Sequence, residues 1–508
     1  MNNTNQLKVL CLGNETTDTD FLTLQLANLS GNQNYGLITD PAFVPDCAGY
    51  YHTTVADLSE GHIRNMSQHF DRVVWLDQPQ RSYPHFKTFV RTFRLIKHLE
   101  HTGVQVEYIS NANSQRINYW WNFLRTNQSF CHHPFGAMIP DQADKVNICP
   151  KTKIPIKSVY EIADWRTDPD YRKLRDPMLV GKKLPLHCMD CYDKESKGIE
   201  STRQFETLEW AVRLELEDEQ GFNRLVDPVF YEIRPSNKCN LMCRMCDDAR
   251  SHLIEKENIE LGKPLIPWRF QDLPFDKIKL ETLQRIYVGG GEPTIMPEFT
   301  DFLQKCISAG KTDFELCVGT NGMKFSNKMI DLLSNFDDVV LSISFDGYGL
   351  VNDYIRWRSD FDIIHRNALM MKKLGHKIGL QTVPSMYNLT RLHELFEFFD
   401  QEFPGSSCLV QGAQADPPSV DPWYHPCPEL VVASMEKCYK TNVYLANGRS
   451  CQGYVEGLHA FYSNPDYKVN THMLKQFFDF NDQLDQARGS LLIDYIPELE
   501  GARRLINL

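Results

Sequence analysis

Three cysteines lie close enough in the sequence to bind one group together. Residues 238–246 read KCNLMCRMC, which gives Cys239, Cys243 and Cys246 a C-x3-C-x2-C spacing. Cubane 4Fe–4S clusters are normally held by four cysteine thiolates, so three thiolates would leave one iron open to a further ligand. Zinc prefers four closed thiolate or imidazole ligands, and His252 is near enough to supply the fourth. The spacing alone therefore leaves both metals open.

A glycine-rich acidic motif follows at Gly290, Gly291 and Glu292. Glycines without a Cβ let a ligand approach the backbone, and a glutamate offers an acceptor for an ammonium group. This combination suits binding of the ammonium end of an amino acid. An amino-acid chelate is also a ligand that an open iron can take.

Ser342, Ser344 and Asp346 alternate along a further apolar run. In a strand, side chains two residues apart project to one side, so these oxygens could hold ribose hydroxyls or neighbouring polar atoms. The alternative is that the serines are ordinary polar strand residues without a binding role. Taken with the glycine motif, they fit a nucleoside that carries an amino-acid tail.

Six short apolar runs alternate with helical or loop segments from about residue 227 onward. Such a βα rhythm predicts a partial (β/α)6 TIM-type barrel, whose active site lies at the carboxyl ends of the strands. The cysteines follow the first run directly, so we expect them at that face. The predicted strands are residues 229–235, 285–290, 314–320, 339–347, 377–384 and 407–412.

A separate βαβ rhythm occupies residues 7–111 and predicts a Rossmann-like αβ domain. Residues 13–15 do not match G-x-G-x-x-G, so dinucleotide binding is not supported. We expect four parts in all. They are the αβ domain at 1–111, a cysteine-rich module at 112–222, the barrel at 223–412 and a C-terminal helical extension at 413–508.

The motifs of residues 227–410 resemble the radical S-adenosylmethionine (SAM) superfamily. The cysteine loop, G-G-E-P, T-N-G at 320–322 and S-I-S-F-D-G with a following Ile355-Arg356 match that pattern in order. The resemblance implies that SAM chelates the open iron of a 4Fe–4S cluster and is cleaved reductively to a 5′-deoxyadenosyl radical. It also implies that Gly290, Gly291 and Glu292 contact the methionine end, and that Ser344 and Asp346 contact the ribose region.

A second set of thiols precedes the barrel: Cys131, Cys149, Cys188 and Cys191. Four thiolates can hold zinc or a closed iron–sulfur cluster, and spacing cannot choose between them. The surrounding CHHPF, NICPK and LHCMDCYDKES resemble the SPASM or twitch module, which here precedes the core that it usually follows. That resemblance implies one auxiliary iron–sulfur cluster, with a structural zinc site as the alternative.

The composition of the chain argues against nucleic acid and membranes as partners. The chain has 508 residues, 42% hydrophobic and 24% charged, with a formal net charge of −12 and fifteen cysteines. These values fit a globular protein without the basic footprint of a nucleic-acid binder, and we find no run apolar enough to span a bilayer. Without a secretory signal at the start, we expect a cytoplasmic protein with metal-binding rather than disulfide-bonded cysteines.

Three functions remain open. The first is radical hydrogen-atom abstraction that modifies a peptide or protein, with a flavodoxin or ferredoxin as electron donor. The second is dehydrogenation or epimerisation of a sugar or other small molecule. The third is a non-catalytic iron–sulfur or zinc scaffold, because fold does not fix function.

Overall fold

The computed structural model describes most of the chain after residue 111. Before it, the described residues are 8–12, 34–39, 51–54, 72–76 and 105–109. After it they are 112–140, 145–150, 152, 154–197, 201–268, 275–404, 406–410, 418–443 and 449–506. Contacts divide the chain into two compact units, with unit 1 ending at Pro228 and unit 2 holding residues 229–508 together with 139–146 and 158–161.

Unit 1 begins with a five-stranded parallel sheet in the order β3-β2-β1-β4-β5. That order is the one doubly wound folds use, but the connecting segments lie outside the described residues, so the Rossmann-like assignment stays a prediction. The strands are β1 Lys8–Leu12, β2 Asn34–Thr39, β3 Tyr51–Thr54, β4 Arg72–Leu76 and β5 Gln105–Ile109.

The rest of unit 1 is mainly helical and carries clear local signals. Asp168 caps α6 by accepting the N–H groups of Asp170 and Tyr171. Ser201 and Gln204 form a capping box at the start of α8. The helices are α4 Ala112–Thr126, α5 His133–Gly136, α6 Pro169–Leu179, α7 Pro185–Ser196, α8 Thr202–Arg213 and α9 Glu219–Asn223. The short strands β6 Ala137–Pro140, β7 Lys145–Asn147 and β8 Pro155–Ser158 have residues in both units.

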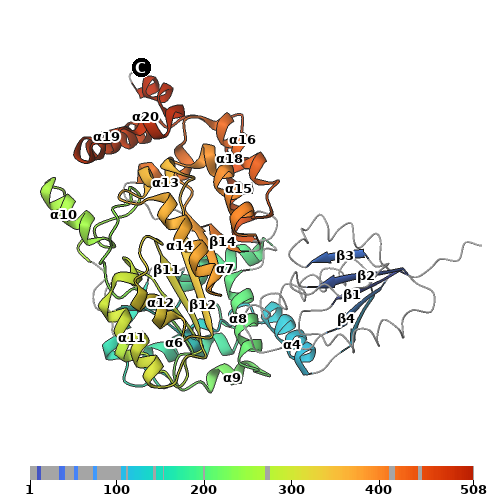
Figure 1. Ribbon diagram of the computed structural model, residues 1–508. Coiled ribbons are helices and arrows are strands. Elements are labelled where there is room, and N and C mark those ends of the chain that lie inside the picture. The colour runs from blue at the N-terminus through green and yellow to red at the C-terminus, as the bar shows by residue number, and fades with distance from the viewer. Residues whose placement is uncertain are drawn as a thin grey trace, which may run out of the picture. The chain divides into compact units, whose positions relative to one another are not determined.

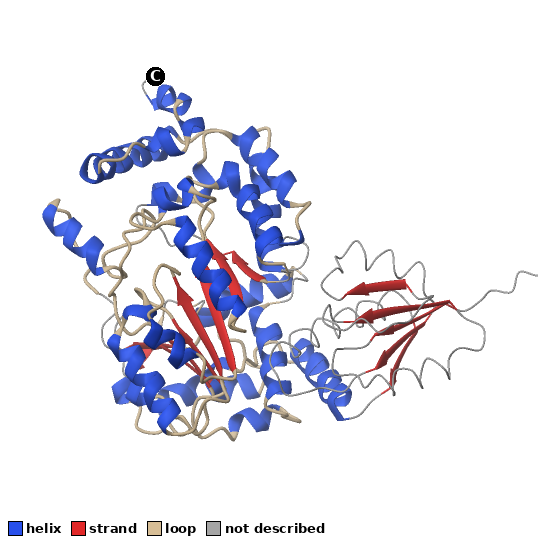
Figure 2. Cartoon of the chain, in the orientation of Figure 1, coloured by secondary structure: helices blue, strands red, loops and turns tan. Residues whose placement is uncertain are grey.

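Unit 2 contains six parallel strands that pair in chain order, as a partial (β/α)6 barrel requires. Figure 2 shows arrows of this sheet with helices beside them. Along β12, buried residues alternate with less buried ones, so the strand presents one face to the apolar core. The strands are β9 Phe230–Ile233, β10 Arg285–Val288, β11 Glu315–Thr320, β12 Asp338–Ser344, β13 Lys377–Thr382 and β14 Ser407–Val410. All six runs predicted from the sequence form these strands.

Helices connect the strands and then continue to the end of the chain (Figure 1). The connecting helices are α10 His252–Glu260, α11 Pro297–Ser308, α12 Asn327–Leu333, α13 Leu350–Ile355, α14 Phe361–Lys373 and α15 Leu392–Glu402. The C-terminal helices are α16 Pro428–Cys438, α18 Arg449–Tyr462, α19 Thr471–Arg488 and α20 Leu492–Tyr495. Asn470 caps the start of α19, and Gly489, in a left-handed conformation, ends it.

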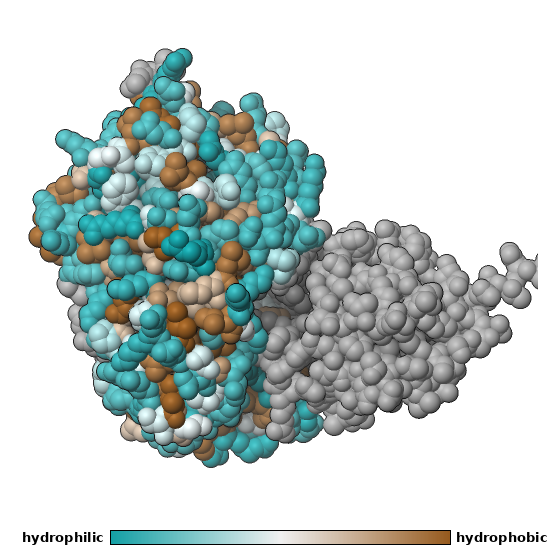
Figure 3. All heavy atoms as spheres, in the orientation of Figure 1, coloured by the Kyte–Doolittle hydropathy of each residue, from teal (hydrophilic) through white to brown (hydrophobic). Residues whose placement is uncertain are grey.

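The C-terminal helices share an apolar core with the barrel. Phe477 of α19 and Leu492 of α20 are buried in one cluster with Tyr354, which follows the fourth barrel strand, and Tyr387, which follows the fifth. The region predicted as a helical extension is therefore built into unit 2. On the face drawn in Figure 3, the described surface is mainly hydrophilic with apolar residues in small groups. Among the described residues, no helix is both long and apolar enough to cross a membrane.

Candidate active site

The predicted cysteine loop connects β9 to α10, at the carboxyl end of the first barrel strand. Its backbone is hydrogen-bonded to the last residue of α13 and to the segment that follows it. The N–H of Met242 donates to the carbonyl of Trp357 at 3.0 Å, and the N–H of Arg244 donates to the carbonyl of Ile355 at 2.8 Å. These bonds fix the chain on both sides of Cys243, so the thiols are presented by an ordered loop.

The three thiols interact with one another. Burial, followed by the neighbouring Cys243, raises the pKa of Cys239 to about 12. Burial raises the pKa of Cys246 well above its usual value, and Cys243 and Cys239 raise it further. Burial also raises the pKa of Cys243, against the opposing charge of Arg356. Because metal clusters bind thiolates, a bound group must displace these protons.

One contact disfavours zinc at this loop. His252 Nδ1 accepts the N–H of Cys239 at 3.1 Å, so in the neutral imidazole Nε2 carries the proton and offers no lone pair. Without that imidazole, the three loop thiols do not make up the four closed ligands that zinc prefers.

Gly290 and Gly291 make room for the cysteine loop itself. A Cβ on Gly290, which has a φ of +104°, would lie 2.8 Å from the carbonyl oxygen of Ser236. A Cβ on Gly291 would lie 2.1 Å from the carbonyl oxygen of Lys238. That same oxygen accepts the N–H of Glu292 at 2.7 Å. We expected these glycines to admit a ligand, and the close approach in the structure is to the residues just before Cys239.

Glu292 is fully buried and already well hydrogen-bonded. Its Oε1 accepts the N–H of Thr294 at 3.1 Å and the hydroxyls of Thr294 at 2.6 Å and Thr320 at 2.7 Å. Its Oε2 accepts the N–H of Asn321 at 2.6 Å. Burial raises the pKa of Glu292, and these bonds work in the opposite direction. The carboxylate thus joins the ends of β10 and β11 beside the cysteine loop.

Asp346 lies just past the end of β12 and is buried. Its Oδ2 is 2.6 Å from Arg356 Nη1, and its Oδ1 accepts the N–H of Val383 at 2.8 Å. Ser344, the last residue of β12, is less buried and shares a strand face with Ser342. The structure therefore gives Asp346 protein partners and leaves Ser344 on the more accessible face.

Arg356 stands between Asp346 and the cysteines. Burial alone would lower its pKa, but the charges of Cys243, Asp346 and Cys239 raise the pKa overall. Its Nε is buried with no hydrogen-bond partner among the described residues. An unsatisfied guanidinium N–H beside a cluster of thiols is costly in the absence of a ligand, so this atom points to an anionic group.

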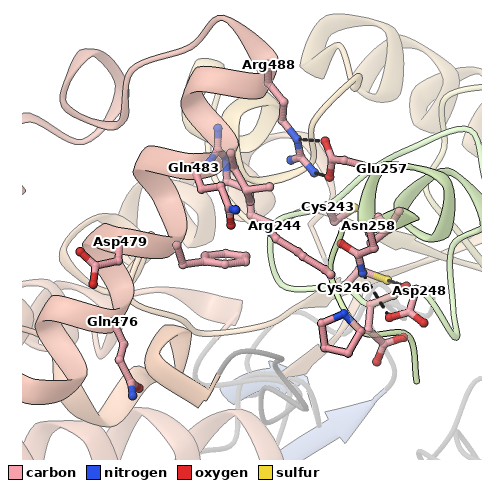
Figure 4. A pocket seen from close by; sticks show the side chains of 16 residues that line it. Cys243, Arg244, Cys246, Asp248, Glu257, Asn258, Gln476, Asp479, Gln483 and Arg488 are labelled. Atoms are coloured by element: carbon pink, nitrogen blue, oxygen red, sulfur yellow. Dashed lines mark hydrogen bonds and ion pairs between the residues drawn. The ribbon is translucent and has the colours of Figure 1, made fainter. Parts of the chain in front are cut away.

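A cavity of about 580 Å³ borders the loop on the side of α10 and α19. Cys243, Cys246 and Arg488 are among the side chains that line it, and Figure 4 shows Arg488 reaching across to Glu257. The Arg488 guanidinium also donates to the carbonyl of Met242 at 3.0 Å. No local sequence pattern predicts that α19 contacts the cysteine loop.

The second set of thiols gathers in unit 1. Cys131 precedes α5, Cys149 follows β7, and Cys188 and Cys191 lie on α7, which is kinked at Cys188. Burial raises the pKa of Cys131 well above its usual value, and Cys149, Cys188 and Cys191 raise it further. The four residues predicted as a second metal site thus come from three separate segments, and the other three lie near enough to Cys131 to affect its pKa.

One family model matches the barrel region of the chain. Residues 233–399 match the family model of the Radical SAM superfamily. The matched segment contains the cysteine loop, Glu292, Asp346 and Arg356. A curated relative, 7-carboxy-7-deazaguanine synthase of Haemophilus influenzae, is 28% identical over 115 residues, which are 23% of this chain and 46% of the relative.

The solved structures that match are less similar in sequence than this relative. Streptococcus suis SuiB bound to S-adenosylmethionine is 16% identical, with a TM-score of 0.27 over 47% of this chain and 54% of SuiB. Native anSMEcpe with bound AdoMet is 17% identical, with a TM-score of 0.32 over 42% of this chain and 60% of that one. The chain covers less than two thirds of the length of each of these relatives. Such TM-scores do not establish a common overall fold.

Proposed function

We propose that this protein is a radical SAM enzyme that holds a 4Fe–4S cluster through Cys239, Cys243 and Cys246 and abstracts a hydrogen atom from its substrate. The observation that carries the proposal is the group of three interacting thiols on the β9–α10 loop, inside the segment that matches the superfamily. The bound cluster and SAM would supply the 5′-deoxyadenosyl radical. The protein positions both and excludes water.

Arg356 fits the methionine carboxylate of SAM. Its Nη1 donates to Asp346, and its Nε is buried without a described partner. The guanidinium is therefore held in place while the Nε–H remains available to a ligand. A charge-assisted bond to a carboxylate would satisfy that donor. Glu292 can receive the methionine amino group only by sharing oxygens that already have four protein donors. Ser344, on the accessible face of β12, is the remaining candidate for the ribose.

The substrate is proposed to be a peptide or protein side chain, because the cysteine-rich module of residues 112–222 resembles modules of peptide-modifying enzymes. The alternative is a small molecule, which the name of the curated relative supports. A flavodoxin or ferredoxin would supply the electron. The four thiols of unit 1 are proposed as ligands of an auxiliary metal centre, for which the resemblance implies an iron–sulfur cluster and the residues leave zinc open.

The test of the core proposal is formation of 5′-deoxyadenosine from SAM by anaerobically reconstituted, dithionite-reduced protein. We expect formation by the wild type and loss in Cys243→Ala, together with loss of the iron that this loop binds. The control is Cys306→Ala, which changes a buried cysteine on α11 remote in sequence from the loop. If the wild type binds iron at the loop but has no affinity for SAM, the proposal of a radical SAM enzyme is wrong and a non-catalytic iron–sulfur scaffold is favoured.

The substrate class can be tested with deuterium. Extract from cells grown in deuterated medium is separated into small molecules and macromolecules, and each fraction is incubated with the reduced enzyme. Hydrogen abstraction transfers deuterium to 5′-deoxyadenosine, which mass spectrometry detects. Transfer from the macromolecular fraction is expected, whereas transfer only from the small molecules would favour the alternative.

A further inference from the structure

His133 lies against the second set of thiols in a way that the sequence did not indicate. Its Nδ1 is 3.4 Å from the sulfur of Cys131, and both residues are buried. The ligand atoms of Cys131, His132 and His133 all lie within 4.8 Å of one another. Zn–S and Zn–N bonds of about 2.3 and 2.0 Å place a sulfur and a nitrogen on one tetrahedral ion roughly 3.5 Å apart. The spacing of Cys131 and His133 therefore suits two ligands of one ion.

The other side of the His133 ring faces a carboxylate. Its Nε2 is 3.1 Å from Oε2 of Glu206 on α8. The contact does not meet hydrogen-bond geometry, and the Glu206 side chain is 31% exposed. Histidines that bind metals usually donate their second ring N–H to such a carboxylate, which fixes the tautomer and leaves the first nitrogen unprotonated. In this arrangement the free lone pair of Nδ1 is directed at Cys131.

His132 is placed differently. Its Nδ1 is 3.5 Å from the hydroxyl of Thr207, and its Nε2 is 3.9 Å from Glu206. The neighbouring histidine therefore has its Nδ1 turned toward a hydroxyl instead of toward the Cys131 sulfur. The two residues, adjacent in the sequence and both buried, form a natural pair for comparison.

We propose that the auxiliary metal centre of unit 1 is a mononuclear zinc site in which Cys131 and His133 are ligands, Glu206 orients the His133 ring, and two of Cys149, Cys188 and Cys191 complete the tetrahedron. His133 then takes the place of one of the four thiols predicted as ligands. Thiolate and imidazole are the ligands zinc takes in closed structural sites. A cubane cluster, in contrast, is normally held by thiolates alone and would not require the ring at ligand distance. The site is independent of the reaction proposed for the radical SAM domain.

The experiment uses the full-length protein with the three loop cysteines changed to alanine, so that iron at the loop does not obscure the second site. Zinc and iron are counted after anaerobic purification, and X-ray absorption at the zinc edge reports the ligand atoms. We expect about one zinc per chain, bound by three sulfurs and one nitrogen. An all-sulfur shell around zinc, or about four iron atoms per chain without zinc, would overturn the proposal.

Variants then separate ligation from packing. His133→Ala is expected to weaken zinc binding by more than about 100-fold, and Glu206→Gln by about 10- to 100-fold, whereas His132→Ala keeps wild-type affinity. Equal loss in His132→Ala and His133→Ala would contradict a specific role for His133. If His133→Ala does not fold, Co²⁺ substituted into the parent protein decides the matter, since its visible spectrum distinguishes an S3N from an S4 ligand set.

Discussion

Arg244 and Asp485 form a buried ion pair, with 2.6 Å between Nη2 and Oδ1, that joins the cysteine loop to α19. Arg244 lies between Cys243 and Cys246 in the sequence and is also bonded to Asn481 and to the carbonyl of Tyr354. Its guanidinium stacks over the Tyr354 ring at 3.7 Å. A single side chain thus ties the loop to α19 and to the end of α13.

Asp485→Ala would leave the Arg244 guanidinium buried without its charge partner. Removing one member of a buried pair typically costs about 3–5 kcal/mol, so we expect a marked fall in the free energy of unfolding. Because Arg244 is part of the loop, iron retention at the three cysteines should fall as well. Denaturant unfolding and iron analysis measure the two effects.

The matched control is Asp479→Asn on the same helix, whose partner Lys475 and own side chain are both about 60% exposed. An exposed i,i+4 pair contributes about 0.3–0.5 kcal/mol, so stability should hardly change. Equal losses in the two variants would argue that α19 contributes only helix packing.

The barrel strands were predictable because each is a short apolar run that alternates with helical or loop segments in a βα rhythm. All six of those runs form strands. Tyr51–Thr54, the strand β3, was missed because its residues YHTT carry no apolar signal. The Arg244–Asp485 pair could not be predicted, since its members are separated by 241 residues and neither belongs to a local pattern.

Some site residues could likewise be predicted from a local sequence pattern, whereas others could not. Glycine spacing and a nearby glutamate marked residues 290–292 as important, but the pattern cannot say whether the space is for a ligand or for another backbone. In the structure a Cβ at these glycines would meet the backbone of Ser236 and Lys238, whose positions depend on how the loop folds. His133 likewise had no metal-ligand spacing to reveal it, because its partner Glu206 comes from a distant helix.

Gly291→Ala is predicted to displace the cysteine loop. Its Cβ would lie 2.1 Å from a backbone oxygen of Lys238, which cannot move away as a flexible side chain could. We expect iron occupancy at the loop to fall to less than half, with a loss of stability of about 1–3 kcal/mol. Gly453→Ala in α18, where nothing lies within 4 Å of the added carbon, should leave iron content unchanged. Normal iron content in Gly291→Ala would refute the tight packing.

Glu292→Gln is predicted to destabilise the protein before any cofactor is added. An amide has one acceptor oxygen, so one or more of the donors from Thr294, Thr320 and Asn321 would lose its partner in a fully buried site. The expected loss is about 1–3 kcal/mol in denaturant unfolding of the metal-free protein. An unchanged midpoint, with weaker SAM binding alone, would instead assign Glu292 to the cofactor.

Metal binding at the cysteine loop is predicted to release protons. Burial raises the pKa of Cys239 to about 12 and raises those of Cys243 and Cys246, and neighbouring thiols add to the rise at Cys239 and Cys246, which favours the thiol form at neutral pH. Affinity for a thiophilic cation should therefore rise with pH throughout the range 6–8, by up to about tenfold per pH unit for each proton released. Titration with Cd²⁺ in buffers of different ionisation enthalpy counts those protons. A pH-independent affinity would mean that the thiols are already ionised.

Arg356→Lys is predicted to weaken SAM binding while sparing the cluster. Lysine can keep the charge opposite Asp346 but lacks the Nε that is buried without a described partner. Hydrogen bonds to charged groups contribute about 1.5–3 kcal/mol, so we expect the Kd for SAM to rise about 10- to 100-fold in the reconstituted protein. Iron content and the cluster spectrum should match the wild type. Arg391→Lys, which alters a half-buried ion pair with Glu498, tests the general cost of the exchange and should leave the Kd unchanged. If both variants bind SAM as the wild type does, Arg356 serves only to hold Asp346, and the methionine carboxylate must find another donor.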